Sequence, residues 1–596
     1  MNDEDTSTAT PLYAKPTGLN RPLRVVLVAS PQVPGWVRAF LELATGNDWL
    51  DLVVVTAVGA VLPTVSDVSV DLRAFLAYER AVFKHADASL VLKTIRSDHA
   101  DVSVEQGASV PLHARVSALH PDLVLLLGPQ SWASGLAYQA PWGCWHVDAS
   151  LTDPCYAGLS LLAPMMRGET ATQMELVLQG PTKAPIALAG SWGRTRAPSF
   201  LMQREHAFRK LPPLLVRALH RVAAGQVPAP HCSVATLHLH SLQSPLGRAA
   251  GLRALAWTLR ATARSLAAQI TNRKGGWMLV LRDGGAMLDP EAPVIGSHAI
   301  LKAPSGWWAD PCVIAAGGRK LLFVEEMAAK STKGTIACVE LIGGGARRLG
   351  MAIDEPGHLS FPQPFLWEGQ WYMTVESSYA RRVGLYRATG FPLDWVRVRD
   401  LITGWVCVDP TLYHHEGHWY LFANVAESGN STYDDLFLFV AESLEGPFRP
   451  HPAAPIVGDV RRARLAGRLF HHRGRLIRPA QDCGPRYGKA VVFNEVLELG
   501  PTVYRERPLS RLAADWARSL DGCHTYNADG GVEVLDVRGR PPADAIYVPV
   551  FDDGGSGARS RRTPLPGRIP IQSRLGPVID APLPSGGMTH TDHPHR

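Results

Sequence analysis

The sequence Trp308-Ala-Asp-Pro-Cys312, which runs on to Lys320-Leu-Leu-Phe-Val-Glu-Glu326, decides the fold. A Pro-bearing start, a strand, a glycine turn and a second strand are typical of a β-hairpin. The pattern returns with starts near residues 310, 361, 409 and 468, a period typical of propeller blades. The later copies are Phe361-Pro-Gln-Pro-Phe with Gln370–Glu376, Val408-Asp-Pro-Thr-Leu-Tyr with His418–Asn424, and Ala466-Gly-Arg-Leu-Phe with Gly474–Asp482.

Four repeats are clear, and a fifth can be assembled from the two ends of the region. One small antiparallel sheet cannot bury both of its faces, so such sheets pack radially around an axis. The fifth sheet would combine Trp277–Arg282 with the segment around His524–Val537. We therefore predict an all-β five-bladed propeller over residues 275–540.

The N-terminal part has a different pattern, in which apolar strands alternate with helices. Leu23–Ala29, Leu50–Thr56 and Pro121–Leu127 are apolar runs, and Gly35–Ala44 has helical spacing. This alternation predicts an α/β domain with a mostly parallel sheet over residues 21–225. We expect residues 1–20 to be disordered, 226–274 to be a helical connector, and the Pro-, Gly-, Ser- and Arg-rich 541–596 to be a mobile tail.

Composition excludes several functional classes. The 596 residues are 46% hydrophobic and 19% charged, as in an ordinary soluble protein, and the net charge of +6 is spread along the chain. We expect no nucleic-acid partner, because the basic runs Arg461–Arg464 and Arg559–Arg562 are short. The eight cysteines form no CxxC pair, the N-terminus is acidic, and Val25–Ala29 is too short for a signal core or a membrane span. A cytoplasmic location is expected.

The propeller prediction brings distant residues to one mouth. The innermost strand of each blade begins near the axis, and the second strand ends at the same rim. Carboxylates gathered there can bind hydroxyls or move protons, and aromatic faces can cover a sugar ring. The first group is Asp310, Ser360, Asp409 and Arg468, and the rim group is Glu326, Glu376 and Asp482, with Trp308 nearby.

Each residue also has a purely structural interpretation. Asp-Pro pairs commonly form turns, so either Asp310 or Asp409 alone is more simply a turn residue. Their recurrence at one phase of two repeats favours function. We predict no metal site, because the histidines at 414, 415 and 418 flank a hairpin tip without supporting carboxylates.

Residues 308–504 resemble the N-terminal domain of plant glucosamine inositolphosphorylceramide transferases and their bacterial relatives. The resemblance rests on Ala309-Asp-Pro311, Phe323–Glu326, Gly357-His-Leu-Ser-Phe-Pro362, Ala466-Gly-Arg468 and Arg478-Pro-Ala-Gln-Asp482. That domain is similar to the five-bladed propeller of arabinanases and xylosidases. The resemblance implies chemistry on carbohydrate.

The hydrolases of that type use one Asp as base, a second Asp and a Glu acid. Asp310 matches the first and Asp409 is a plausible second, but no Glu occurs between Glu445 and Glu495. We expect Glu376 to supply the acid in a new arrangement, and Arg468 and Arg478 to hold a phosphate or carboxylate of the donor. The other expected substrate-binding residues are Trp308, Glu326, His358, Ser360, Gln481 and Asp482.

Residues 21–225 resemble the formyltransferase fold, on Pro121–Leu126, Pro141–Leu151 and Arg167-Gly-Glu. Active members carry Asn-x-His and a later Asp. Here His146 and Asp148 stand in those places, and no Asp occurs from Pro154 to Arg282. We interpret this site as degenerate, because the groups that support formyl transfer are missing. His146 and Asp148 are either a new pair or structural.

The sequence therefore predicts a carbohydrate-active protein of bacterial glycan or glycolipid biosynthesis that performs glycosyl transfer at the propeller mouth. It would take a nucleotide-sugar or another activated sugar donor and act beside partner enzymes of one biosynthetic cluster. Two alternatives stay open. One is a non-catalytic glycan-binding or scaffolding protein, and the other is a formyltransferase-related enzyme acting on a sugar.

Overall fold

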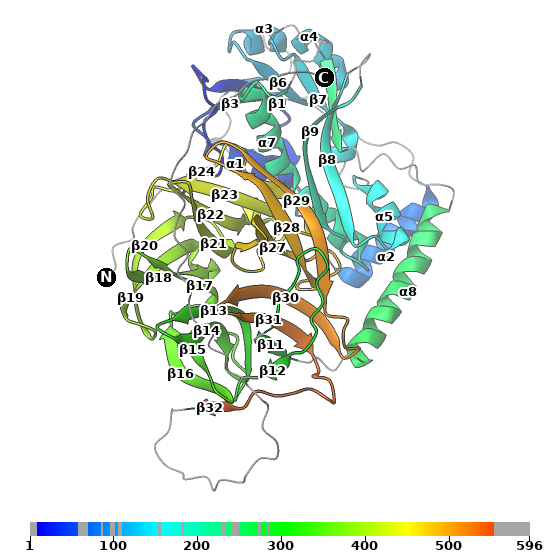
Figure 1. Ribbon diagram of the computed structural model, residues 1–596. Coiled ribbons are helices and arrows are strands. Elements are labelled where there is room, and N and C mark those ends of the chain that lie inside the picture. Colours follow the sequence, from blue (N-terminus) through cyan, green and yellow to red (C-terminus); the bar gives the residue numbers. More distant parts are fainter. Residues whose placement is uncertain are drawn as a thin grey trace, which may run out of the picture. The chain divides into compact units, whose positions relative to one another are not determined.

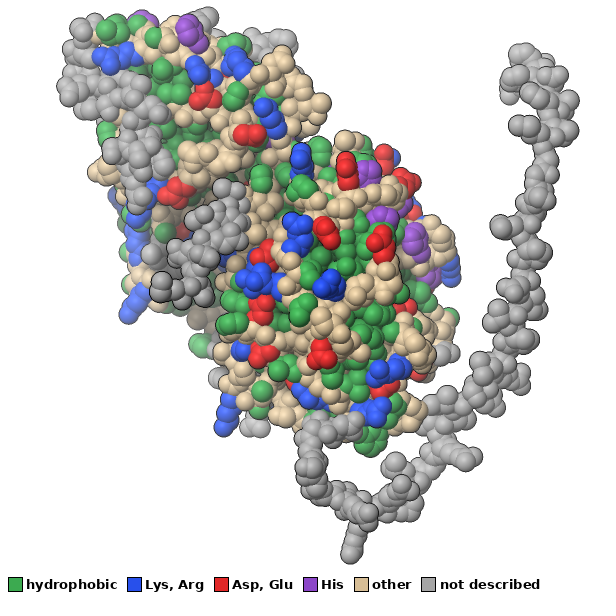
Figure 2. Space-filling model, turned by 90° about the vertical axis from the view of Figure 1, so that its left-hand side faces the viewer, with side chains coloured by type: hydrophobic (Ala, Val, Ile, Leu, Met, Phe, Trp, Pro, Cys, Tyr) green, Lys and Arg blue, Asp and Glu red, His purple; other side chains and the backbone are tan. Residues whose placement is uncertain are grey.

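The computed structural model describes residues 9–552 except 58–68, 85–87, 96–101, 105–109, 138, 153–156, 181–183, 228–233, 240–248, 272–275 and 284. An α/β domain precedes a propeller in one compact unit that ends at Gly554 (Figure 1). Among the described helices, none is long and apolar enough to cross a membrane. On the face drawn in Figure 2, basic and acidic side chains are interspersed. The predicted mobile tail 541–596 is wrong in its first part, because β32 Val550–Asp552 pairs in parallel with β16 of the first blade. Residues 553–596 lie outside the described residues.

The α/β domain is built on an eight-stranded sheet. Its strand order is β5-β3-β1-β6-β7-β10-β8-β9. The first six strands run parallel, and β8 is antiparallel to both of its neighbours, β10 and β9. The predicted mostly parallel sheet is confirmed, whereas a formyltransferase-like fold stays a prediction. The strands are β1 Leu23–Ala29, β3 Leu50–Ala57, β5 Val102–Val104, β6 Leu123–Leu127, β7 Cys144–Val147, β8 Ala171–Gln179, β9 Ile186–Arg194 and β10 Val234–Leu239.

Helices cover this sheet. β1 and β6 are buried on both faces, as apolar runs in a covered parallel sheet must be. In α7 nearly every side chain is buried, since the helix lies between the sheet and the propeller (Figure 1). The main helices are α1 Gly35–Ala44, α2 Val70–Phe83, α3 Leu112–Ser117, α4 Ala133–Ala137, α5 Leu162–Arg167, α6 Phe200–Phe208, α7 Leu211–Ala223 and α8 Ala250–Thr271.

Two expectations for this half differ from the structure. The predicted helical connector is interrupted by β10, which fills the slot between β7 and β8, so the α/β domain extends to Leu239. The β-branched residues Val234 and Thr236 favour that strand. Residues 9–20 are ordered, because Leu12 and Tyr13 are buried against the apolar core.

Five sheets form the propeller, as predicted. The ring closes through β11 Trp277–Asp283, which pairs with β31 Val532–Gly539, so the two ends of the region share one blade. The blades are β13 Trp307–Ala316 to β16 Gly345–Ile353, β17 Ser360–Trp367 to β20 Asp394–Thr403, β21 Cys407–His415 to β24 Arg449–Pro450, β26 Phe470–His472 to β29 Tyr504–Ala513, and β30 Leu520–Asp529 with β31, β11 and β12 Ala299–Leu301. The second strands of the first four blades are β14 Arg319–Met327, β18 Gln370–Ser377, β22 His418–Val425 and β27 Arg475–Asp482.

A β-bulge recurs at the start of the innermost strands. Asp310, Phe361 and Asp409 have φ values of 47°, 50° and 50°, and the register shifts at each of them. Each is followed by a proline, which cannot donate a ladder hydrogen bond. Because a bulge re-aims the side chain beside it, the repeated Asp-Pro is both a backbone device and a means of turning Asp310 and Asp409 toward the axis.

Candidate functional site

Five buried carboxylates gather at the propeller axis, and we call them the axial cluster: Asp310, Glu325, Glu376, Asp409 and Asp536. Each is at most 6% exposed. They come from four blades, on β13, β14, β18, β21 and β31. The fourth blade supplies Gln481 and, from the loop before β26, Arg464. All five blades therefore contribute to one polar site.

Asp409 is held on both oxygens. Arg464 donates from Nε and Nη2 at 2.6 and 3.1 Å, and the Gln481 amide donates at 2.9 Å. The guanidinium lies over the rings of Tyr433 and Tyr487, at 5.2 and 4.9 Å. Because it is paired with a carboxylate and stacked on two aromatic rings, the guanidinium of Arg464 is a positive charge held in a fixed position.

Two members of the cluster favour the protonated form. Burial, followed by the charge of Asp409, raises the pKa of Glu376 to about 7. Burial also raises the pKa of Asp310 well above its ordinary value, with further contributions from Glu325 and Asp536. Like charges close together in a dry site cannot all ionise, so the cluster can hold and move protons near neutral pH.

Asp536 braces the opposite side of the cluster. It accepts the backbone N–H groups of Asp310 at 2.9 Å and of Thr525 at 2.9 Å, and it lies 2.6 Å from Nδ1 of His524. The Nε2 atom of His524 lies 3.5 Å from Asp310, and Trp277 stacks on the imidazole at 3.9 Å. Ligand atoms of Asp310, His524 and Asp536 lie within 4.8 Å of one another, so these three residues can hold a metal ion. The sequence did not indicate this group.

The structure brings several predicted residues together at the axis. Asp310, Glu376 and Asp409 are in the cluster, and Gln481 contacts it directly. Ser360 is buried opposite Glu376 in the β17–β18 register. His358 lies 3.2 Å from Glu325, which raises the pKa of the imidazole.

The structure ties the remaining predicted residues to other partners. Glu326 accepts from the Trp308 indole and pairs with Arg348 through both oxygens. The guanidinium of Arg468 donates to the carbonyls of Val313 and Pro364. Asp482 pairs with Arg511, and Arg478 with Glu506.

Arg478 offers a direct check of its structural role. Its side chain is fully buried and pairs with Glu506, whose side chain is 4% exposed. Arg478→Met should lower the free energy of unfolding by about 3 kcal/mol, because Glu506 would be buried without its main partner. The matched control is Arg505→Met, which removes an exposed pair with Glu498 and should cost under about 1 kcal/mol. Urea denaturation of both variants measures the difference, and equal losses would contradict the assignment.

The two residues that the formyltransferase resemblance singled out have local partners. His146 is buried on β7, and Nε2 lies 3.2 Å from the carbonyl of Gly128. Burial lowers the pKa of this imidazole. Asp148 accepts the backbone N–H of Ser150 at 2.6 Å. These contacts favour the structural interpretation.

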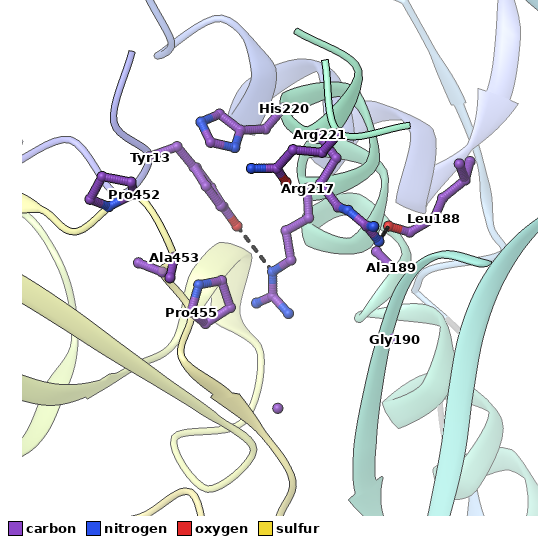
Figure 3. A pocket seen from close by; sticks show the side chains of 13 residues that line it. Tyr13, Leu188, Ala189, Gly190, Arg217, His220, Arg221, Pro452, Ala453 and Pro455 are labelled. Carbon is purple, nitrogen blue, oxygen red and sulfur yellow. Dashed lines mark hydrogen bonds between the residues drawn. The ribbon is translucent and has the colours of Figure 1, made fainter. Parts of the chain in front are cut away.

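A separate cavity of about 390 Å³ lies between the two domains (Figure 3). It is lined by Tyr13, by Arg217 and His220 of α7, and by the segment of the third blade that carries Pro452 and Pro455. Of its two arginines, Arg217 is paired with Glu427 and Asp435, and Arg221 donates to the backbone carbonyl of Leu188. The cavity is therefore part of the domain junction and does not include the axial cluster.

Fold and site together define a five-bladed propeller with a cluster of buried carboxylates at its axis. Residues 280–546 match the family model "Glucosamine inositolphosphorylceramide transferase 1, N-terminal". The protein of that name from Arabidopsis thaliana is 36% identical over 208 residues, which are 34% of this chain and 27% of the relative. The one from Oryza sativa subsp. japonica is 34% identical over 267 residues, or 44% and 35%. The chain thus spans about a third of the length of the curated relatives it matches.

Solved structures with a similar arrangement include two carbohydrate hydrolases. Zg3597, a family 117 glycoside hydrolase from Zobellia galactanivorans, has a TM-score of 0.29 and 14% identity over 39% of this chain and 84% of that one. The Cellvibrio cellulosa α-L-arabinanase has a TM-score of 0.27 and 13% identity over 34% and 77%. The matched curated relatives are plant proteins, so the expected bacterial pathway has no support from them.

Proposed function

We propose that the chain acts in glycan or sphingolipid biosynthesis and that its axial cluster binds a sugar during glycosyl transfer. The observation that carries the proposal is Glu376, a buried carboxyl with a pKa of about 7 beside the carboxylate of Asp409, which pairs with Arg464. A general acid or base works best when its pKa is near the working pH. The similarity of residues 280–546 to proteins named as transferases supports the same class.

The geometry suggests distinct roles for the three candidate residues. Glu376 would donate a proton to the leaving oxygen or take one from the attacking hydroxyl. Asp310, whose pKa is raised by burial and by its carboxylate neighbours, would bind a sugar hydroxyl and would also hold a proton of the cluster. Asp409 would act on Glu376 through its charge, because its own oxygens are taken up by Arg464 and Gln481. Nothing in this scheme requires a resident cofactor.

The substrate class follows from the names of the relatives. They are called glucosamine inositolphosphorylceramide transferases, so we propose a glycolipid headgroup as acceptor and an activated sugar as donor. Partner enzymes of the same pathway and a cytoplasmic location belong to the same proposal.

A second candidate is glycan binding without turnover. Both oxygens of Asp409 are occupied, which favours a rigid binding site over a reactive one. Most of the length of the relatives also lies outside the match, so the transfer in their names need not occur in the matched part. Either candidate places the sugar at the axial cluster.

Product formation tests the choice. The purified chain is incubated with a panel of nucleotide-sugars and an inositolphosphorylceramide acceptor, and products are followed by mass spectrometry. We expect a glycosylated lipid that the double variant Asp310→Asn/Glu376→Gln fails to form. Product formation by the double variant at the wild-type rate would contradict the proposed function. Glycan binding by calorimetry without any product would favour the second candidate.

A further inference from the structure

A group of arginines lies beside the propeller mouth, and we call it the arginine cluster: Arg194, Arg196 and Arg486. Arg194 ends β9 of the α/β domain, Arg196 follows it, and Arg486 is in the loop between β27 and β28. Neither the predicted site nor the roles proposed above include these residues. The α/β domain and one mouth loop of the propeller thus bring Arg196 and Arg486 within electrostatic range of Arg194.

The end of β9 is fixed on the mouth loops of the propeller. Trp192 forms a β-bridge with Asp459, and its carbonyl accepts the N–H of Val460 at 3.0 Å. Ala171, which is opposite Arg194 in the β8–β9 register, is buried with Val460. This attachment is built from backbone hydrogen bonds and apolar packing, so the position of Arg194 does not depend on its own charge.

The cluster holds more positive charge than its neighbours neutralise. Nε of Arg194 and both terminal nitrogens of Arg486 are shielded from solvent and form no hydrogen bond among the described residues. Asp521 lies 3.3 Å from Arg486 but also pairs with Arg538 at 3.1 Å. Asp434 lies within electrostatic range of Arg196 but pairs with Lys210 at 2.6 Å. Burial, followed by the charges of Arg196 and Arg486, lowers the pKa of Arg194. Buried donors left without partners cost free energy that a bound anion can restore.

Nearby cations are treated differently. Arg461 pairs with both oxygens of Asp459 and stacks on Trp192 at 4.3 Å. Lys210 is buried and lies 2.6 Å from Asp434. At the same junction, therefore, other cations have partners and the arginine cluster lacks enough of them.

Two tyrosines connect the arginine cluster to the axial cluster. Tyr433 lies close enough to Arg194 to influence its pKa, and its ring centroid is 5.7 Å from that of Tyr487. Tyr487 in turn feels the charges of Asp310 and Asp409, and both rings lie against Arg464. The arginine cluster thus lies near the axial cluster, with the rings of Tyr433 and Tyr487 between the two.

We propose that Arg194, Arg196 and Arg486 bind the phosphate group of a phosphorylated sugar or polyol whose hydroxyl-bearing ring lies toward the axial cluster. Guanidinium forks suit phosphate oxygens. A carboxylate has only two oxygens, whereas a phosphate ester offers more acceptors to three guanidinium groups. The inference deepens the proposed function and rests on it for the identity of the ring, but the anion site can be tested alone.

Calorimetry with three probes tests the site: inorganic phosphate, myo-inositol 1-phosphate and myo-inositol. The variant is Arg194→Gln/Arg486→Gln, and the control is Arg397→Gln, which alters an exposed arginine paired with Asp400. Loss of two charged hydrogen-bonding groups should weaken inositol phosphate binding by ~100-fold, while the control binds as the wild type does. Affinity should also fall with added salt. Equal affinity of wild type and double variant for both phosphate probes would overturn the inference.

Further variants separate this site from the proposed function. Arg194→Lys/Arg486→Lys keeps the charge and should recover part of the affinity, which a folding defect would not allow. Glu376→Gln should still bind inorganic phosphate, because it leaves the arginine cluster intact. If phosphate binding depends on the arginines but no variant or wild type turns over, the anion site stands and the transfer proposal fails. If the wild type forms product and phosphate binding is unchanged in the arginine variants, the transfer proposal stands and the anion site fails.

Discussion

Glutamine at position 376 is expected to reduce turnover by about 100- to 10,000-fold, the usual contribution of a general acid or base. The substitution keeps the shape of Glu376 and removes its proton. If Glu376 acts as an acid with a pKa of about 7, wild-type activity is present below that pH and is lost as the pH rises through it. The variant should lack this alkaline limb. Rates measured from pH 5 to 9 give both quantities.

The same substitution has a signature in stability that requires no substrate. The pKa of Glu376 is raised from 4.5 to about 7, so its contribution to stability is complete below pH 4.5 and is lost as pH rises through 7. The loss amounts to about 3 kcal/mol. The free energy of unfolding of Glu376→Gln, relative to that of the wild type, should therefore rise by that amount between pH 4.5 and 8, as measured by urea denaturation. Glu498→Gln, an exposed carboxylate paired with Arg505, is the control and should track the wild type at every pH. Parallel curves for all three proteins would refute a raised pKa at Glu376.

The repeat accounts for what the sequence revealed of the site. Asp310 and Asp409 occupy the same position in two repeats. At that position each strand has a β-bulge with positive φ, which turns the side chain to the axis. The closure of the ring could also be predicted, because the strand Trp277–Arg282 needed a partner strand from the other end of the region. Periodicity therefore identified the blades and the level of the site along the axis.

Which face a side chain takes was harder to predict. Neighbouring residues on a strand point to opposite faces, so a choice displaced by one residue reverses the outcome. Glu326 was expected at the rim, yet Glu325 belongs to the axial cluster and Glu326 pairs with Arg348. The predicted pair Gln481 and Asp482 divides in the same way, since Gln481 contacts Asp409 and Asp482 pairs with Arg511.

Residues outside the repeat gave no periodic signal. Arg464 lies in an irregular loop, and the inner strand of the fifth blade has His524 at the phase where two other blades have Asp-Pro. The register shift between Cys523 and Tyr526 is the equivalent bulge, so the phase could have indicated His524. Asp536 could not be found in this way, because it acts from a second strand on the backbone of two others.

Replacing Arg217 by methionine is expected to lower the free energy of unfolding by about 3 to 5 kcal/mol. Arg217 of α7 crosses from the α/β domain to pair with Glu427 and Asp435 of the propeller, and it donates to the hydroxyl of Tyr13 at 3.2 Å. All of these partners are buried, so the variant would leave two carboxylates in a dry junction without their cation. Urea denaturation followed by tryptophan fluorescence measures the loss.

Arg221→Met is the matched control, because Arg221 is one turn further along α7 and donates only to backbone carbonyls, the nearest being Leu188 at 2.7 Å. It should cost about 1 kcal/mol. The pH dependence separates a lost ion pair from lost packing. Burial already raises the pKa of Glu427, and without Arg217 that pKa must rise further, so acidification protonates the stranded carboxyl and narrows the gap between variant and wild type. A gap that stays constant from pH 7 down to 5 would mean that Arg217 stabilises the junction through its methylenes and not through its charge.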